Sequence, residues 1–209
     1  MSIELLNVDC MEYMAGLPDN AFDLAIVDPP YGIGNWVNFT GNAKNRIGIK
    51  IVEWNEKENR PSKEYLTELQ RVSQRRVIWG SNYYSWVDGH GGSLVWNKHM
   101  PRESNMSICE IASVSWLKRV DYVDLKWQNI NRKENVIHPC QKPVSLYRWI
   151  LRNYAKPGQR ILDTHLGSGS SAIAAHYSGF DFVGCEIDAD YFAAAQQRFD
   201  CETAQVAMF

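Results

Sequence analysis

The stretch 28–31, Asp-Pro-Pro-Tyr, combines a carboxylate, two prolines and an aromatic ring directly after the apolar run 24–27. Pro29 and Pro30 fix the backbone φ angle and lack N–H donors, so the apolar run must end there in an extended shape. Open α/β sheets bind their ligands at the carboxyl ends of strands. Residues 28–31 therefore form a candidate binding or catalytic site, and the carboxylate of Asp28 is its chemically active group.

A second candidate site lies near the end of the chain, where a strand, a glycine-rich turn, a helix and another strand follow one another in 160–186. Gly167 and Gly169 let the backbone approach a ligand closely because they have no Cβ. Glu186 lies about 20 residues after the first glycine, the spacing at which a carboxylate binds the ribose hydroxyls of an adenosine-containing cofactor. NAD, FAD and S-adenosylmethionine all use such a unit.

Asp163, at the tip of the first of these two strands, narrows the choice of cofactor. A carboxylate there attracts a ligand with a cationic amine and repels a pyrophosphate. A NAD enzyme would also need a second half after this unit, and only 23 residues follow Glu186. The pattern therefore favours S-adenosylmethionine, in a sheet that the N-terminal part completes.

The surrounding elements alternate between strand and helix patterns. Four helices are predicted, at 62–72, 143–154, 171–177 and 189–199. This alternation predicts an α/β fold, a Rossmann-like, seven-stranded, mostly parallel sheet. The strands are predicted at 5–8, 23–27, 76–79, 93–96, 108–116, 160–162 and 181–185.

Composition and charge limit the class of protein. A chain of 209 residues with 45% hydrophobic residues suits one domain, and we expect it to act in the cytoplasm because no segment resembles a signal peptide or a membrane span. Five cysteines without a CxxC pair predict neither disulfides nor a structural zinc site, and we expect no metal. The net charge is only −2, but the charges are unevenly distributed: both ends of the chain are acidic, and the middle, 32–162, carries +10. A basic middle suits a nucleic-acid partner.

Three motifs occur in an order that resembles the β class of DNA amino-methyltransferases. They are DPPY at 28–31, HPCQKP at 138–143, and the run from Asp163 through the glycine turn to 184–188. The resemblance covers most of the chain. The stretches 79–83 (Trp-Gly-Ser-Asn-Tyr) and 96–98 (Trp-Asn-Lys) resemble members that are often found on phages and mobile elements. The chain departs from the class at 164–166 (Thr-His-Leu) and at Cys140, where Pro-Phe-Ala and Thr are usual.

The resemblance implies a circularly permuted fold, with the catalytic half first and the cofactor half last. It implies transfer of a methyl group from S-adenosylmethionine to N6 of adenine in duplex DNA after base flipping, with N4 of cytosine as the alternative. The Asp28 carboxylate and the Pro29 carbonyl would accept the two N–H groups of the amine, Pro30 would keep them rigid, and Tyr31 would stack on the base. The residues say nothing about a cognate restriction endonuclease.

The resemblance also assigns the cofactor site. Asp163 would bind the ammonium, Glu186 the ribose, Asp9 or Cys10 the adenine edge, and Lys142 the carboxylate at the start of a helix. The cofactor residues are Asp9, Cys10, Asp28, Lys142, Asp163, Gly167, Ser168, Gly169, Ser170, Ser171, Glu186 and Ile187.

Basic residues within about 35–60 and 97–137 are candidates for DNA contacts in recognition loops of a single domain, 1–209. One such domain would cover few base pairs, so we expect a homodimer. The candidates are Lys44, Arg46, Lys98, Arg102, Lys118, Arg119, Lys126, Arg132 and Lys133.

Four other functions remain open. Pro139-Cys140-Gln141 resembles the nucleophile motif of cytosine ring-carbon methyltransferases, in which a thiolate adds covalently to the base. The glycine turn alone also permits a NAD-dependent oxidoreductase. A DNA-binding module without catalysis is a third possibility, and an amino-methyltransferase acting on RNA or protein is a fourth.

Overall fold

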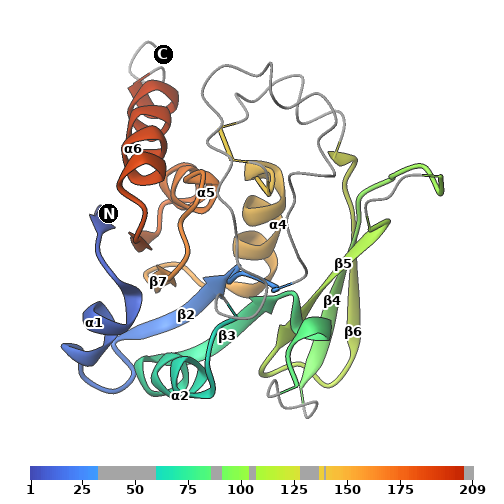
Figure 1. Cartoon of the computed structure of the whole chain (residues 1–209), viewed down its shortest axis with the longest axis horizontal. Coiled ribbons are helices and arrows are strands. Elements are labelled where there is room, and N and C mark those ends of the chain that lie inside the picture. Colours follow the sequence, from blue (N-terminus) through green and yellow to red (C-terminus); the bar gives the residue numbers. More distant parts are fainter. Residues whose placement is uncertain (33–59, 86–90, 104–106, 128–136, 139, 205–209) are drawn as a thin grey trace.

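The computed structural model describes residues 1–32, 60–85, 91–103, 107–127, 137–138 and 140–204. In these residues one eight-stranded sheet, in the order β1-β8-β7-β2-β3-β5-β4-β6, forms the centre of the molecule (Figure 1). The strands are β1 (Ile3–Asn7), β2 (Phe22–Val27), β3 (Ser73–Trp79), β4 (Gly92–Asn97), β5 (Cys109–Val114), β6 (Val120–Asp124), β7 (Arg160–Asp163) and β8 (Asp181–Glu186).

The direction of β5 determines which residues meet at the edge of the sheet. All neighbouring strands are parallel except that β5 is antiparallel to β3 and to β4. The amino end of β5 therefore lies beside the carboxyl ends of its neighbours: Cys109 pairs with Asn97, and Ala112 with Trp79.

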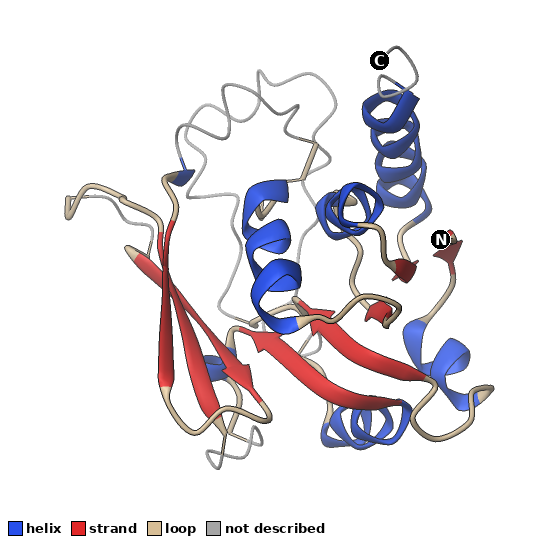
Figure 2. Ribbon diagram, turned by 180° about the vertical axis from the view of Figure 1, so that it is seen from behind, coloured by secondary structure: helices blue, strands red, loops and turns tan. Residues whose placement is uncertain are grey.

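Helices cover both faces of the sheet (Figures 1 and 2). One face carries α1 (Cys10–Ala15) and α2 (Lys63–Val72). The other carries α4 (Val144–Tyr154), α5 (Ser170–Ser178) and α6 (Ala189–Thr203). A short 3-10 turn, η3 (Ser81–Tyr83), follows β3.

Strand β2 shows why both faces need a cover. Leu24 and Ile26 belong to the hydrophobic cluster under α4 and α5, whereas Ala25 and Val27 belong to the cluster under α1 and α2. Side chains alternate between the two faces of a strand, so a continuous apolar run fits only a strand that is covered on both sides. The apolar run ends at Val27, and Asp28 follows it at the carboxyl end of β2.

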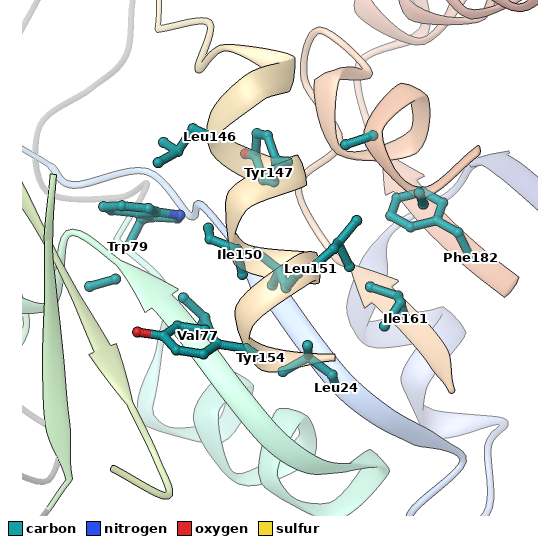
Figure 3. Close-up of a cluster of buried hydrophobic side chains, with 14 of the residues drawn as sticks. Leu24, Val77, Trp79, Leu146, Tyr147, Ile150, Leu151, Tyr154, Ile161 and Phe182 are labelled. Carbon is teal, nitrogen blue, oxygen red and sulfur yellow. The ribbon is translucent and has the colours of Figure 1, made fainter. Parts of the chain in front are cut away.

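Helix α4 packs across the centre of one face. Its apolar residues recur at the three- and four-residue spacing that places them on one side of a helix. Figure 3 shows them against Leu24 and Val77 of the sheet. The buried residues of α4 are Leu146, Tyr147, Ile150, Leu151 and Tyr154.

The α/β class is confirmed, but seven was the wrong number of strands. The additional strand is β6, in a segment without a clear strand pattern. Val120 and Tyr122 are 67% and 57% exposed because β6 is an edge strand, so it lacks the apolar run of a buried strand. Because β5 and β6 are strands of the central sheet, the described part of 97–137 is only partly loop. In the described residues, no helix has the length and apolar character needed to cross a membrane.

Candidate active site

The acids singled out from the sequence lie at the carboxyl edge of three adjacent parallel strands. Asp28 follows β2, Asp163 ends β7 and Glu186 ends β8. Strand β7 lies between the other two, with Ala25 of β2 beside Leu162, and Asp163 beside Gly184 of β8. The topology thus places the Asp-Pro-Pro-Tyr segment next to the glycine-rich turn.

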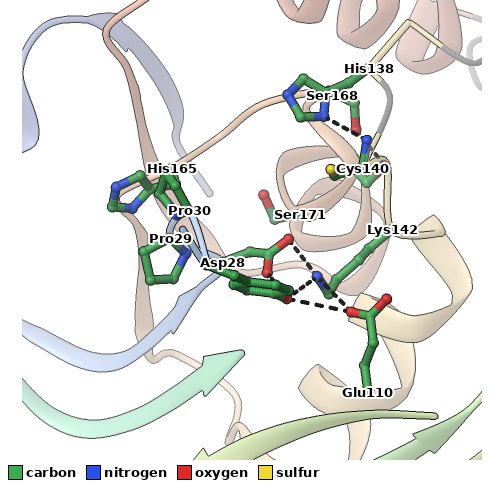
Figure 4. Close-up of polar contacts among 12 residues, drawn as sticks. Asp28, Pro29, Pro30, Glu110, His138, Cys140, Lys142, His165, Ser168 and Ser171 are labelled. Atoms are coloured by element: carbon green, nitrogen blue, oxygen red, sulfur yellow. Dashed lines mark hydrogen bonds and ion pairs between the residues drawn. The ribbon is translucent and has the colours of Figure 1, made fainter. Parts of the chain in front are cut away.

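Asp28 belongs to a group of four charges, in which the two lysines are buried and the side chains of Asp28 and Glu110 are 16% and 19% exposed. Its Oδ2 lies 2.5 Å from Nζ of Lys142, which lies 3.0 Å from Oε2 of Glu110. The other oxygen of Glu110, Oε1, lies 2.8 Å from Nζ of Lys98. The side chains of Asp28, Lys142 and Glu110 point toward one another from three different segments (Figure 4). Two carboxylates and two ammonium groups balance, as a buried cluster requires.

Burial and charge act in opposite directions on these groups. Burial opposes ionisation of Glu110, but the ammonium groups of Lys142 and Lys98 outweigh it and lower its pKa to about 2. Burial also opposes the charge of Lys142, yet the carboxylates of Asp28 and Glu110 raise its pKa above the ordinary value. At Asp28 burial prevails over the attraction of Lys142, so its pKa is raised. Asp28 is therefore a more basic carboxylate than an exposed aspartate.

Tyr31 is tied to the same cluster. Its hydroxyl donates to Oδ1 of Asp28 at 2.6 Å and accepts from Nζ of Lys142 at 2.9 Å. Its ring stacks on Tyr83, with centroids 5.2 Å apart and planes 18° from parallel. Burial raises the pKa of Tyr31 well above its ordinary value, which keeps the hydroxyl protonated as a donor.

The Pro29 carbonyl is held by a residue that follows η3. The hydroxyl of Tyr84 donates to the carbonyl oxygens of Pro29 and Pro30, at 2.7 and 3.1 Å. Tyr84 is only 6% exposed, so this contact fixes the direction of the carbonyl from within the protein. A carbonyl oxygen has a second lone pair, which stays available for a ligand.

On the neighbouring strand, Asp163 is a fully buried carboxyl. It accepts from the hydroxyl of Ser171 at 2.6 Å and from the backbone N–H of His165 at 3.0 Å. Burial raises the pKa of Asp163 to about 7, although these two hydrogen bonds oppose the shift. The group therefore changes charge near neutral pH.

The glycine turn is shaped by two left-handed residues and closed by an acid. Gly167 and Gly169 have φ angles of +52° and +75°. Oε2 of Glu186 accepts from the backbone N–H of Gly167 at 2.8 Å, and its Oε1 accepts from that of Asp188 at 3.0 Å. From α6, the buried Arg198 donates to the carbonyl of Ser168 at 2.9 Å.

The remaining cofactor candidates lie at the same edge of the sheet. Asp9 caps α1 by accepting from the backbone N–H groups of Met11 and Glu12, and Cys10 begins that helix. Ile187 follows Glu186 and is 69% exposed. Ser168, Ser170 and Ser171 are buried around the glycine turn.

Two lysines differ from their predicted roles. Lys142 was expected to receive a cofactor carboxylate, but its ammonium binds Asp28 and Glu110. Lys98 was expected to contact DNA; it is 4% exposed and paired with Glu110, so it is not accessible to a phosphate. Glu110, whose side chain is 19% exposed, is the acid that pairs with both ammonium groups.

The other basic residues fall into three groups. Lys118 and Arg119 connect β5 to β6 at the amino edge of the parallel strands, at the opposite edge of the sheet from Asp28. Arg102 and Lys126 are exposed and follow the carboxyl ends of β4 and β6. Lys44, Arg46, Arg132 and Lys133 lie outside the described residues, as does the loop predicted at 35–60.

The surroundings of Cys140 do not favour a nucleophilic thiolate. Desolvation, followed by the Asp28 carboxylate, raises the pKa of the Cys140 thiol to about 12, although the residue is exposed. The N–H of Cys140 donates to Nδ1 of His138 at 3.2 Å, and burial lowers the pKa of that imidazole to about 4. A neutral histidine and a protonated thiol oppose the ring-carbon mechanism.

A comparison with protein families decides the class of protein. The model of the N6/N4 methyltransferase family, described as DNA methylase, matches residues 78–197, which is more than half of the chain. The chain belongs to this family of DNA methylases. A curated relative, the putative methylase YubD of Escherichia coli K12, is 28% identical over 91% of this chain and 87% of its own length.

Solved structures of DNA methylases share the fold. The M1.HpyAVI complex with S-adenosylmethionine superposes with a TM-score of 0.60 at 21% identity, over 95% of this chain and 99% of that one. The PvuII DNA methyltransferase, which is cytosine-N4-specific, has a TM-score of 0.64 at 11% identity, over 98% and 91%.

Proposed function

We propose that this DNA methylase transfers a methyl group from S-adenosylmethionine to N6 of adenine, with the base flipped out of duplex DNA. The observation that supports the proposal most directly is the adjacency of β2 and β7. It places the acceptors of Asp28 and Pro29 beside the glycine turn that begins at Asp163. A methyl acceptor and a methyl donor must meet in this way for direct transfer.

S-adenosylmethionine is the methyl donor of this family, and it supplies an electrophilic methyl group on a sulfonium sulfur. The donor set at β7 and β8 suits it. Asp163 offers a buried carboxylate for the ammonium, and Glu186 offers one for the ribose hydroxyls. The φ angle of +52° at Gly167 favours glycine, and a Cβ there would lie at ordinary contact distance, 3.9 Å, from His138 and the carbonyl of His165.

Asp28 and Pro29 supply the chemistry at the target base. The lone pair of an exocyclic amine is delocalised into the ring, so the amine is a poor nucleophile. Hydrogen bonds to the Asp28 carboxylate and the Pro29 carbonyl stabilise the positive charge that develops on the nitrogen. The amine must also lose a proton, and the raised pKa of Asp28 suits it to accept that proton.

The choice of adenine rests on the Asp-Pro-Pro-Tyr motif. Cytosine N4 remains the second candidate, because the fold is shared with an enzyme of that specificity. The test uses purified protein, tritiated S-adenosylmethionine and whole-genome-amplified DNA, which carries no methylation. After digestion to nucleosides, we expect the label in N6-methyladenine; label confined to N4-methylcytosine would exclude adenine. Label on RNA alone would exclude duplex DNA.

The conservative variant Asp28→Asn tests the catalytic assignment. Removing one preorganised electrostatic contact of this kind lowers kcat by on the order of 10²-fold or more. We expect that loss of kcat at saturating S-adenosylmethionine. Unchanged methyl transfer by the variant would remove Asp28 from the mechanism.

We also propose that residues 1–209 act as a single cytoplasmic methyltransferase domain of the permuted type, and as a homodimer on DNA. The support for the dimer is the small size of the sheet and its helices compared with the surface that specific DNA recognition buries. Light scattering with and without DNA tests it, and a monomeric mass in both conditions would contradict the dimer.

A further inference from the structure

The two donors that bind Asp28 both have a second acceptor in Glu110. The Tyr31 hydroxyl lies 2.6 Å from Oδ1 of Asp28 and 3.4 Å from Oε2 of Glu110. Nζ of Lys142 lies 2.5 Å from Oδ2 of Asp28 and 3.0 Å from the same Oε2. Each oxygen of Asp28 thus accepts one hydrogen bond from a donor that also contacts Glu110, and each keeps one further lone pair.

This arrangement matters because the proposed reaction needs Asp28 as an acceptor for the target amine. The side chain of Lys142 is 4% exposed, so an ammonium that left Asp28 could not turn to bulk water. A buried donor that loses its acceptor is strongly destabilised. Lys142 and Tyr31 can therefore release Asp28 only if another acceptor is within reach.

We propose that Glu110 is a positioning residue that receives the Lys142 ammonium and the Tyr31 hydroxyl when the target amine binds Asp28. This inference rests on the proposed function and deepens it. Glu110 touches neither the base nor the cofactor in this mechanism; it acts through Lys142 and Tyr31.

Lys98 keeps Glu110 ready for that role. It binds Oε1 at 2.8 Å, which leaves Oε2 directed at Lys142 and Tyr31. Lys98 also balances the second carboxylate, so the cluster stays neutral as Lys142 moves between two anions of equal charge. Because its pKa is about 2, Glu110 remains ionised at any working pH.

The variant Glu110→Gln keeps the size of the side chain and one acceptor oxygen but removes the charge. We expect kcat to fall by about tenfold or more, because Lys142 then stays on Asp28. We expect the dissociation constant for S-adenosylmethionine to remain within about twofold, because Asp163 and Glu186 are untouched.

The pH profile of kcat separates positioning from a general loss of structure. The charged or titratable groups around Asp28 are Lys142, Glu110, Tyr31, Tyr84, Cys140, Tyr147 and Asp163. Without the negative charge of Glu110, the ammonium of Lys142 favours the ionised form of Asp28 more strongly. The acidic limb of the profile should therefore move to lower pH in Glu110→Gln, and the plateau should fall.

Three variants complete the experiment. Glu110→Asp keeps the charge and should retain the position of the acidic limb, with a smaller loss of kcat. Glu68→Gln breaks an ion pair of 2.8 Å with Arg71 on α2, away from the site, and should leave kcat unchanged. If Glu110→Gln does not fold, Glu110→Gln/Lys98→Met removes opposite charges together and should show the same loss of kcat in a folded protein.

The possible results are distinguishable. A Glu110→Gln enzyme with the kcat and acidic limb of the wild type, beside an inactive Asp28→Asn enzyme, refutes the role of Glu110 and leaves the proposed function intact. An equal loss in Glu110→Gln and Glu110→Asp without a shift of the limb would reduce Glu110 to a structural residue. Failure of the wild type to methylate DNA refutes the proposed function itself.

Discussion

Tyr31 lies directly against the backbone of Gly80. A Cβ on Gly80 would lie 2.2 Å from Cε1 of Tyr31, and Gly80 has a φ angle of +71°. The ring thus occupies the space that any side chain at this position would need. The contact between the Tyr31 hydroxyl and Asp28 therefore depends on Gly80, which follows β3 and has no side chain.

Replacing Gly80 with alanine should therefore move Tyr31 and impair catalysis. A displacement of about 1 Å in an active site lowers kcat by on the order of 10²-fold, and we expect a loss of that size. We also expect the free energy of unfolding to fall by about 1–3 kcal/mol from backbone strain and overpacking. Methyl transfer and thermal melting measure the two effects.

Gly158→Ala is the matched control. Gly158 has a φ angle of +82°, but nothing lies within 4 Å of its Cβ position. This variant has the same backbone strain without the clash, so it should lose stability and keep its kcat. Equal losses of kcat in both variants would contradict the role assigned to the contact with Tyr31.

The affinity for S-adenosylmethionine should increase with pH up to about 7. Burial raises the pKa of Asp163 to about 7, so the carboxyl is neutral below that pH and ionised above it. Only the ionised form attracts the ammonium of the cofactor, so the association constant should rise by at most about tenfold per pH unit below the pKa. Calorimetry between pH 5.5 and 7.5 measures the slope.

In Asp163→Asn this dependence on pH should disappear, and the affinity should be weaker at pH 7.5. Asp181→Asn, at an exposed carboxylate on β8, should behave like the wild type. A slope that persists in Asp163→Asn would assign the titration to another group.

Cys140→Ser should retain methyl transfer within about threefold, because the raised pKa of this thiol opposes nucleophilic attack. The measurements are kcat and denaturing electrophoresis of enzyme incubated with DNA. Loss of activity, together with a covalent protein–DNA complex in the wild type, would favour the ring-carbon mechanism instead.

Lys126 is exposed beside the carboxyl end of β6, so Lys126→Ala should weaken DNA binding. The slope of log K against log salt concentration should become shallower by about one, because one phosphate contact is lost. Lys118→Ala removes the same charge at the opposite edge of the sheet and should change neither quantity. Titrations of unmethylated duplex DNA at several salt concentrations provide the comparison, and equal effects would place DNA across both edges.

Local sequence patterns were sufficient for the strands that carry Asp28, Asp163 and Glu186. In each case an apolar run ends in an acid, and parallel strands bring such ends to one edge. The helices at 143–154 and 62–72 were predicted for a similar reason, since apolar spacing and a start at Pro143 or Ser62 are local signals.

Glu110 could not be predicted in this way. It lies near the beginning of a strand, and it reaches the site only because β5 runs against its neighbours. That direction depends on tertiary structure, and an isolated glutamate in an apolar run gives no signal of it. The prediction that Lys98 contacts DNA has the same cause. A lysine that follows a strand is expected to be exposed, and the sequence does not show that Lys98 pairs with Glu110.

The neutrality of the four-charge cluster constrains how this site can diverge. Replacing any one of its members leaves a net charge in a largely buried cluster, whereas replacing an acid and a base together does not. Homologues with a different cluster should therefore have replaced an acid and a base together. Mutational libraries that alter single positions will rarely reach such functional combinations.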